Sequence, residues 1–162
     1  MSVSDHYRQR KKVLFLCTHN SARSQMAEGI LRDLYGDRFE VFSAGAKPST
    51  VDPRAIRVMT EIGIDISRHR SKSMSEFYGK EIDYVVTLCS DAREVCPFFP
   101  GAIEYIHRAF VDPTDISGLE ESMAAFRQVR DELRTWITGV FRRKMEDGVK
   151  RRMPFETNKE MI

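Results

Sequence analysis

The sequence predicts an α/β protein, a three-layer sandwich in which a four-stranded parallel sheet is flanked by helices. Four short apolar runs have the length of buried strands, and segments with apolar residues at helical spacing lie between or after them. Strands that alternate with helices are typical of a parallel sheet. With 162 residues, 41% hydrophobic and 31% charged, the chain suits one domain with a single core. We expect this domain to span residues 12–143, with polar extensions at 1–11 and 144–162.

The first strand and the first helix are expected on either side of a short polar loop. The run Val13–Cys17 is apolar, as in a buried strand of a parallel sheet. Ser24 is expected to cap a helix that Gly36 ends, because apolar residues recur with helical spacing between them. Residues 39–43 predict the second strand.

The rest of the chain supplies two more helices and two more strands. The pair Asp52–Pro53 predicts an N-cap with proline at the first helical position, and Gly63 predicts the end of that helix. Strands are expected at residues 83–88 and 102–106. The last helix is predicted from about 119 to 143, because apolar residues gather on one side of it.

Composition argues against several classes of function. The formal net charge of +2 is too small to predict binding to nucleic acid or membranes, and no apolar run approaches the length of a membrane span. Residues 1–12 lack the apolar stretch of a secretory signal, so we expect a cytoplasmic protein, by default a monomer. Three cysteines in such a protein favour catalytic, redox or metal-binding roles over structural disulfides.

The segment Cys17–Ser24 has the pattern Cys-x5-Arg-Ser between a predicted strand and a predicted helix. Backbone N–H groups of such a loop converge on one point and the helix N-terminus adds partial positive charge, which predicts an oxyanion cradle. Arg23 matches two oxygens of a tetrahedral anion, and the same positive field favours the thiolate form of Cys17. Ser24 could donate a hydrogen bond to that sulfur, and Asn20 tolerates left-handed backbone. The predicted oxyanion-binding residues are Thr18, His19, Asn20, Ser21, Ala22, Arg23 and Ser24.

At this point the chain resembles a known family. The segment Val13–Glu28 is similar to the opening of the low-molecular-weight protein tyrosine phosphatases and of the thioredoxin-coupled arsenate reductases that share their fold. Residues 41–45, 85–92 and 126–133 are similar to the reductase branch, and the resemblance extends over about 12–141. It implies a phosphatase-like fold, arsenate as substrate with phosphate or sulfate as mimics, thioredoxin as partner, and no cofactor.

The resemblance also implies a role for all three cysteines. Reducing arsenate takes two electrons, which the formation of one disulfide supplies. Cys17 would attack arsenic, Cys89 would attack the Cys17 sulfur, and Cys96 would move the disulfide outward for thioredoxin to reduce. Cys89 directly follows a predicted strand, and the carboxyl ends of parallel strands share the sheet edge where Cys17 also lies. The polar residues 90–95 are expected to form a helical turn or two that unwinds during this relay.

Asp112, which precedes Pro113, is the expected general acid, because the family places its acid in an Asp-Pro pair of this kind. An Asp-Pro pair is also a common turn signature, and Asp115 is a weaker candidate for the acid. His69 and His107 are expected to be structural.

Two positions depart from the family. Ala22 stands where the reductases often carry a further cysteine inside the loop. Some members bind potassium through residues that match Asn20, Glu28 and Ser43, and through a carboxylate. Lys72 occupies the position of that carboxylate here. Because an ammonium can replace the cation, we predict no metal site.

Three alternatives remain open. A tyrosine phosphatase of the same fold would use the loop and Asp112 through a Cys17 phosphoenzyme, without needing Cys89 or Cys96. A sensor of arsenite or soft metals would use the three thiols but leave the oxyanion loop unexplained. A zinc site is chemically possible, although Cys89 and Cys96 are spaced more widely than usual zinc ligand pairs.

Overall fold

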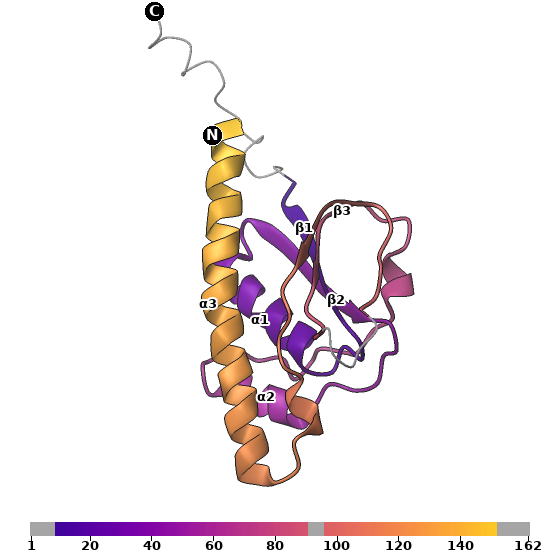
Figure 1. Ribbon diagram of the computed structural model, residues 1–162. Helices are drawn as coiled ribbons and strands as arrows, with labels where there is room; N and C mark the ends of the chain where they lie inside the picture. The colour runs from indigo at the N-terminus through magenta and orange to yellow at the C-terminus, as the bar shows by residue number, and fades with distance from the viewer. Residues whose placement is uncertain (1–8, 91–95, 152–162) are drawn as a thin grey trace, which may run out of the picture.

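The computed structural model describes residues 9–90 and 96–151 (Figure 1). Its elements, with η for 3-10 helices, are β1 (Lys11–Cys17), α1 (Arg23–Tyr35), β2 (Phe39–Gly45), α2 (Pro53–Thr60), η2 (Met74–Phe77), β3 (Ile82–Thr87), β4 (Ala102–His107), η3 (Pro113–Asp115) and α3 (Leu119–Arg151). The strands are all parallel, in the order β2-β1-β3-β4. The predicted four-stranded parallel sheet is confirmed.

The order of the strands puts the end of β1 at the point where the chain changes direction across the sheet. From β1 the chain passes to β2 on one side and then returns to β3 on the other. Val13 to Leu16 are completely buried, which explains the unbroken apolar run of this central strand. In open α/β sheets ligands bind outside the carboxyl ends of strands at such a switch point, and Cys17 is the last residue of β1.

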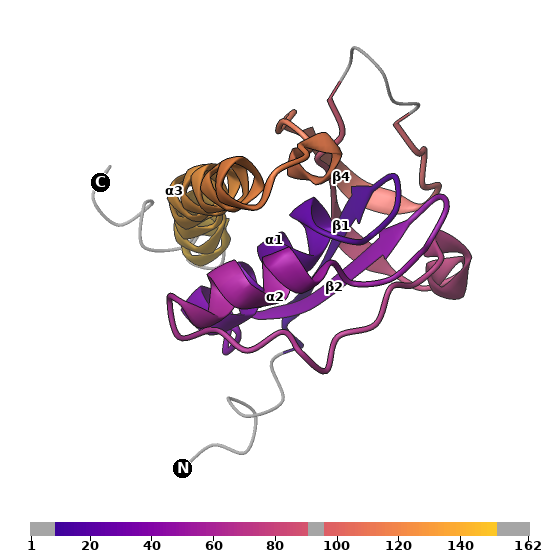
Figure 2. The ribbon, with the colours of Figure 1, turned by 90° about the horizontal axis from the view of Figure 1, so that it is seen from below.

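The two faces of the sheet are covered differently. The three α-helices lie together on one side (Figure 2), where Phe15, Phe126 and Phe141 belong to the main core. On the other side, η2 and the segment around Phe99 cover a smaller apolar cluster that includes Phe77. The predicted three-layer arrangement is therefore confirmed, with one layer made of a short 3-10 helix and its neighbouring segments.

The starts and ends of the helices separate correct predictions from wrong ones. Asp52 caps α2 by accepting a hydrogen bond from Arg54 N, and Gly63 has a positive φ of 79° beyond the end of that helix. Ser24 was the wrong cap for α1: the N-cap is Ala22, with no capping side chain. The predicted end of α3 near 143 was also too early, because the helix continues to Arg151.

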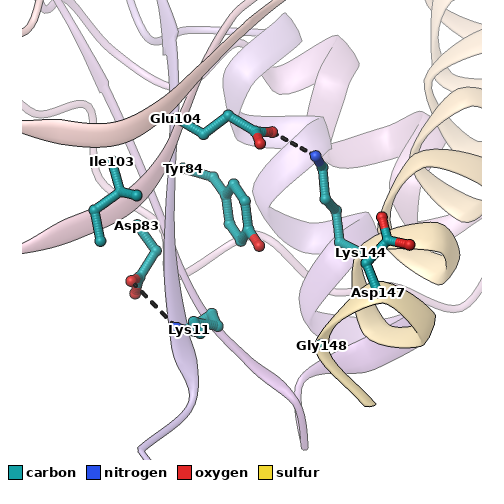
Figure 3. Close-up of a pocket in the computed structure, with 8 residues that line it drawn as sticks. All are labelled: Lys11, Asp83, Tyr84, Ile103, Glu104, Lys144, Asp147 and Gly148. Carbon is teal, nitrogen blue, oxygen red and sulfur yellow. Dashed lines mark ion pairs between the residues drawn. The ribbon is translucent and has the colours of Figure 1, made fainter. Parts of the chain in front are cut away.

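The part of α3 beyond its predicted end near 143 lies at the amino-terminal edge of the sheet, where β1 and β3 begin. The predicted oxyanion loop lies at the opposite edge, where β1 ends. A hollow of about 210 Å³ lies beside this part of α3 (Figure 3). Two ion pairs lie in it: Lys11 with Asp83 at 3.8 Å, and Lys144 with Glu104 at 2.5 Å. The Lys144 ammonium also lies over the ring of Tyr84, so these contacts attach α3 to the sheet. Among the described residues, no helix is both long and apolar enough to cross a membrane.

Candidate active site

The loop between β1 and α1 is held by its carbonyl groups. The carbonyl oxygens of four successive residues accept hydrogen bonds from outside the loop: Thr18 from Lys47 N, His19 from Ser49 N and Ser71 Oγ, Asn20 from Gln25 Nε2, and Ser21 from Asp52 N. In a trans peptide the N–H of the next residue points the opposite way. The N–H groups that follow these four carbonyls therefore face the inside of the loop, as an oxyanion cradle requires.

Side-chain hydrogen bonds hold the Ser24 hydroxyl next to the Cys17 sulfur. The oxygen of the Asn20 amide accepts from Gln25 Nε2 and Lys72 N, both at 2.9 Å. The Asn20 nitrogen must then donate, and it does so to Ser24 Oγ at 2.7 Å. Because Ser24 accepts that bond, its own proton is available to the Cys17 sulfur, 2.9 Å away. The left-handed backbone at Asn20, with φ 51°, is confirmed. Ser24 lies within hydrogen-bond distance of Cys17, while its role as the donor of that bond stays a prediction.

Gly45 makes room for the loop at the end of β2. A Cβ atom at this position would lie 2.8 Å from the Thr18 oxygen and 2.9 Å from the Asn20 nitrogen. Only glycine allows the loop backbone to approach this closely. This contact joins segments far apart in the sequence, so nothing local in the chain could have revealed it.

The predicted arginine and the predicted acid lie side by side. The Arg23 side chain is almost fully buried and donates to the Phe110 carbonyl at 3.2 Å. Its Nη2 lies 3.5 Å from Oδ2 of Asp112. The other carboxylate oxygen of Asp112 accepts bonds from the backbone N and the hydroxyl of Thr114, at 3.0 and 2.7 Å. Asp112 therefore lies beside the loop in a fixed orientation, while its role as general acid stays a prediction.

The three cysteines are in two different states. Cys17 is a free, buried thiol, whereas Cys89 and Cys96 form a disulfide. Leu88 N donates to Leu16 O, so the cysteines that follow these two residues leave neighbouring strands at the same level. Cys89 is completely buried and Cys96 is exposed. The predicted unwinding of residues 90–95 falls largely on residues 91–95, which lie outside the described part of the chain.

The three histidines named in the sequence analysis, His19, His69 and His107, bond to other parts of the protein. His19 is exposed and its Nδ1 lies 3.0 Å from the Lys47 carbonyl oxygen, so its side chain bonds away from the cradle. His107 bonds to Thr87 across β3 and β4. His69 contacts a cluster of charges behind the loop.

That cluster surrounds the Glu28 carboxylate, which is only 4% exposed. Ser43 Oγ donates to Glu28 at 2.7 Å, and Arg32, His69 and Lys72 approach it at 3.0, 3.3 and 3.7 Å. Burial lowers the pKa of both His69 and Lys72, and the charge of Glu28 opposes that shift. Within residues 9–90 and 96–151, no three His, Cys, Asp or Glu side chains are grouped to hold a metal ion.

Sequence reasoning missed one pair of residues next to the site. Asp52 was assigned only as a helix cap and Arg54 was given no role. In the structure their side chains form an ion pair at 2.8 Å, and Arg54 reaches the segment that follows Asp112. The Asp-Pro-Arg order is visible in the sequence, but the segment it contacts lies about 60 residues away.

Comparisons with known proteins agree with this geometry. The low molecular weight phosphotyrosine protein phosphatase family matches residues 12–151. An arsenate reductase from Halalkalibacterium halodurans is 46% identical over 125 residues, which cover 76% of this chain and 90% of the relative. A solved structure of an arsenate reductase in the phosphate binding state has a TM-score of 0.71 and 33% identity, covering 82% of this chain and 98% of its own. A thioredoxin-dependent arsenate reductase from Corynebacterium glutamicum has a TM-score of 0.67 and 26% identity, covering 89% and 66%. The chain therefore belongs to the low molecular weight phosphotyrosine protein phosphatase family, in its group of arsenate reductases.

Proposed function

We propose that this protein reduces arsenate to arsenite. The observation that carries the proposal is the pairing of a free Cys17 inside an oxyanion loop with a Cys89–Cys96 disulfide at the neighbouring strand end. A hydrolase needs the first feature alone, whereas a two-electron reduction also needs a dithiol. Phosphate and sulfate, which share the tetrahedral geometry of arsenate, should occupy the same loop.

The chemistry follows from the placement of these groups. The Cys17 thiolate attacks arsenic, and Asp112 protonates the oxygen that leaves as water. Cys89 then attacks the Cys17 sulfur, so that the electron pair of the sulfur–arsenic bond stays on arsenic and arsenite departs. Cys96 attacks Cys89, which transfers the disulfide to Cys89–Cys96 and frees Cys17. The bonded pair and the free thiol found in the structure are those that the last step would leave.

We assign the regeneration of the dithiol to thioredoxin. Cys96 is the exposed residue of the disulfide, whereas Cys89 is buried, so we take Cys96 as the target for an external thiolate. Phe98 follows Cys96 by two residues in the sequence, is 75% exposed and stacks on Tyr105. These two rings form an apolar surface suited to a protein partner. The relative from Corynebacterium glutamicum, which is thioredoxin-dependent, supports this assignment. A monomer in the cytoplasm is the setting we propose, because the relay needs a reducing compartment.

Three serine variants test the relay. Arsenite release is measured with thioredoxin, thioredoxin reductase and NADPH for Cys17→Ser, Cys89→Ser and Cys96→Ser, alongside cleavage of an aryl phosphate. We expect all three variants to lose arsenate turnover, because each cysteine carries one thiol exchange. Only Cys17→Ser should lose phosphate ester cleavage, so the other two variants control for folding of the loop.

The phosphatase is the competing function, because the loop, Arg23 and Asp112 would serve ester hydrolysis equally well. If the wild-type protein cleaves aryl phosphates efficiently but shows no arsenate-dependent oxidation of NADPH, the reductase proposal fails. If arsenate turnover persists in Cys89→Ser, the order of the relay is wrong even though the reaction is right.

A further inference from the structure

At the beginning of α2, the side chains of Asp52 and Arg54 are bonded to each other. Arg54 donates to Asp52 through Nε at 3.0 Å and through Nη2 at 2.8 Å. Burial raises the pKa of the Asp52 carboxyl, but the hydrogen bonds from Arg54 outweigh it and hold that pKa below its usual range. The Arg54 guanidinium also lies over the Phe126 ring, 4.7 Å from its centre. The Asp52–Arg54 pair is thus a fixed, charged unit at neutral pH.

The two terminal nitrogens of this guanidinium also bond to the segment that follows the expected acid, Asp112. Arg54 donates to the carbonyls of Thr114 and Ile116, both at 3.3 Å. Thr114 in turn supplies both hydrogen bonds to Oδ1 of Asp112. The orientation of the Asp112 carboxylate therefore depends on a peptide segment that Arg54 holds.

The same pair also contacts the oxyanion loop. The backbone N of Asp52 donates to the Ser21 carbonyl at 2.9 Å, one of the five bonds that turn the four loop carbonyls outward. The start of α2 is consequently bonded to both halves of the site. It sets the position of the Asp112 segment relative to the loop that holds the oxyanion.

We propose that Arg54 is a positioning residue, which acts through Asp112 by holding the acid at proton-transfer distance from the oxyanion's leaving oxygen. The proposal rests on the proposed arsenate reduction. Proton transfer needs heavy atoms about 2.6–3.2 Å apart, and a misplacement of roughly 1 Å can cost about 100-fold in rate. A residue that fixes the acid loop therefore affects the chemical step more than it affects binding.

A double-mutant cycle tests this role. Enzyme reduced with dithiothreitol and freed of it is mixed with arsenate, and the rate of arsenite release in one turnover is measured. Arg54→Met should lower this rate by roughly 10- to 100-fold in the wild-type background. In the Asp112→Asn background the same substitution should change the rate by less than about twofold, because Arg54 acts through the acid. Phosphate affinity should change by less than about threefold.

Two further variants separate positioning from general destabilisation. Arg57→Met places the same substitution at an exposed arginine of the same helix and should leave the rate unchanged. Arg54→Lys keeps the charge beside Asp52 and should recover part of the rate. The thermal midpoint of each variant is recorded, and the cycle is run with Arg54→Lys if Arg54→Met does not fold.

Two results would contradict a positioning role for Arg54. Equal losses in the wild-type and Asp112→Asn backgrounds would show Arg54 to be merely structural and overturn the proposal, as would lost phosphate affinity with an unchanged rate. If the wild type releases no arsenite, the proposed reduction fails, and the same cycle on phenyl phosphate cleavage still decides the role of Arg54.

Discussion

At the scale of single residues, the hydrogen bonds behind the oxyanion loop end on one carboxylate. Asn20 donates to Ser43 at 2.9 Å, and Ser43 donates to Glu28 at 2.7 Å. A carboxylate that is nearly inaccessible to solvent needs compensating positive charge. Here the Arg32 and Lys72 side chains supply it, at 3.0 and 3.7 Å from the carboxylate oxygens.

This arrangement predicts that potassium does not activate the enzyme. The Lys72 ammonium lies 3.7 Å from Glu28 and donates to the Arg70 carbonyl at 3.0 Å, which leaves it fixed beside the carboxylate. Steady-state arsenite formation should therefore be the same in potassium and sodium chloride at equal ionic strength. Lys72→Ala should acquire a dependence on potassium, whereas Lys47→Ala, at an exposed lysine, should not. A sharp rise of wild-type activity with potassium would refute the prediction.

At the scale of elements, the features that the sequence predicted correctly are those that depend on neighbouring residues in the chain. The apolar run of β1, the Asp52–Pro53 start of α2 and the break in regular structure between β1 and α1 are each encoded within a few neighbouring residues, and each is confirmed. The hydroxyl of Ser24 shows the limit of this reasoning. A serine at a helix start predicts a cap, but in this fold the hydroxyl bonds with a sulfur atom seven residues earlier in the chain.

The features that the sequence did not predict depend on distant partners. The apolar pattern of α3 fades after Phe141, yet the helix continues because Lys144 reaches Glu104 and Met145 packs partly on the core. The contact of Arg54 with Thr114 joins two segments that share no local pattern. Periodicity identifies the buried side of a helix but not the tertiary contact that extends it or the carbonyl that a side chain reaches.

The packing of α3 on the sheet predicts a large effect of one aromatic residue. Phe141 is completely buried and its ring lies 5.2, 6.1 and 6.3 Å from those of Phe39, Phe15 and Tyr84. Phe141→Ala should lower the free energy of unfolding by about 3–5 kcal/mol, because it leaves a cavity among these rings. Urea unfolding followed by circular dichroism measures the loss.

The control for this substitution is an exposed aromatic residue. Phe98→Ala removes a side chain that is 75% exposed, and it should change the free energy of unfolding by no more than about 0.5 kcal/mol. If the two variants were equally stable, α3 would not be anchored to the sheet through Phe141.

At the scale of the whole molecule, ion pairs join the end of α2 to α3 along one side of the domain. Glu61 accepts from Arg127 Nη2 at 2.7 Å and from Arg130 Nη1 at 2.8 Å. Arg130 also donates to the Val58 carbonyl at 2.9 Å. These bonds connect the helix that bears Arg54 to the helix that contributes Phe126 and Phe141 to the main core, so they bear on the stability of the entire fold.

The pairing of Glu61 predicts how global stability depends on pH. The hydrogen bond from Arg127, the main cause, and that from Arg130 lower the pKa of Glu61 from 4.5 to about 2. The folded protein therefore binds fewer protons at Glu61 than the unfolded chain between these pH values. The stabilisation is complete above pH 4.5 and is lost as the pH falls toward 2. Urea midpoints of the wild type and Glu61→Gln should differ at pH 6 and converge near pH 2. Arg127→Met should show a smaller difference of the same sign, because Glu61 keeps its bond from Arg130. High salt should reduce the difference, because the pair is exposed and screened. A difference that stays constant from pH 6 to pH 2 would mean that Glu61 stabilises the fold without its charge.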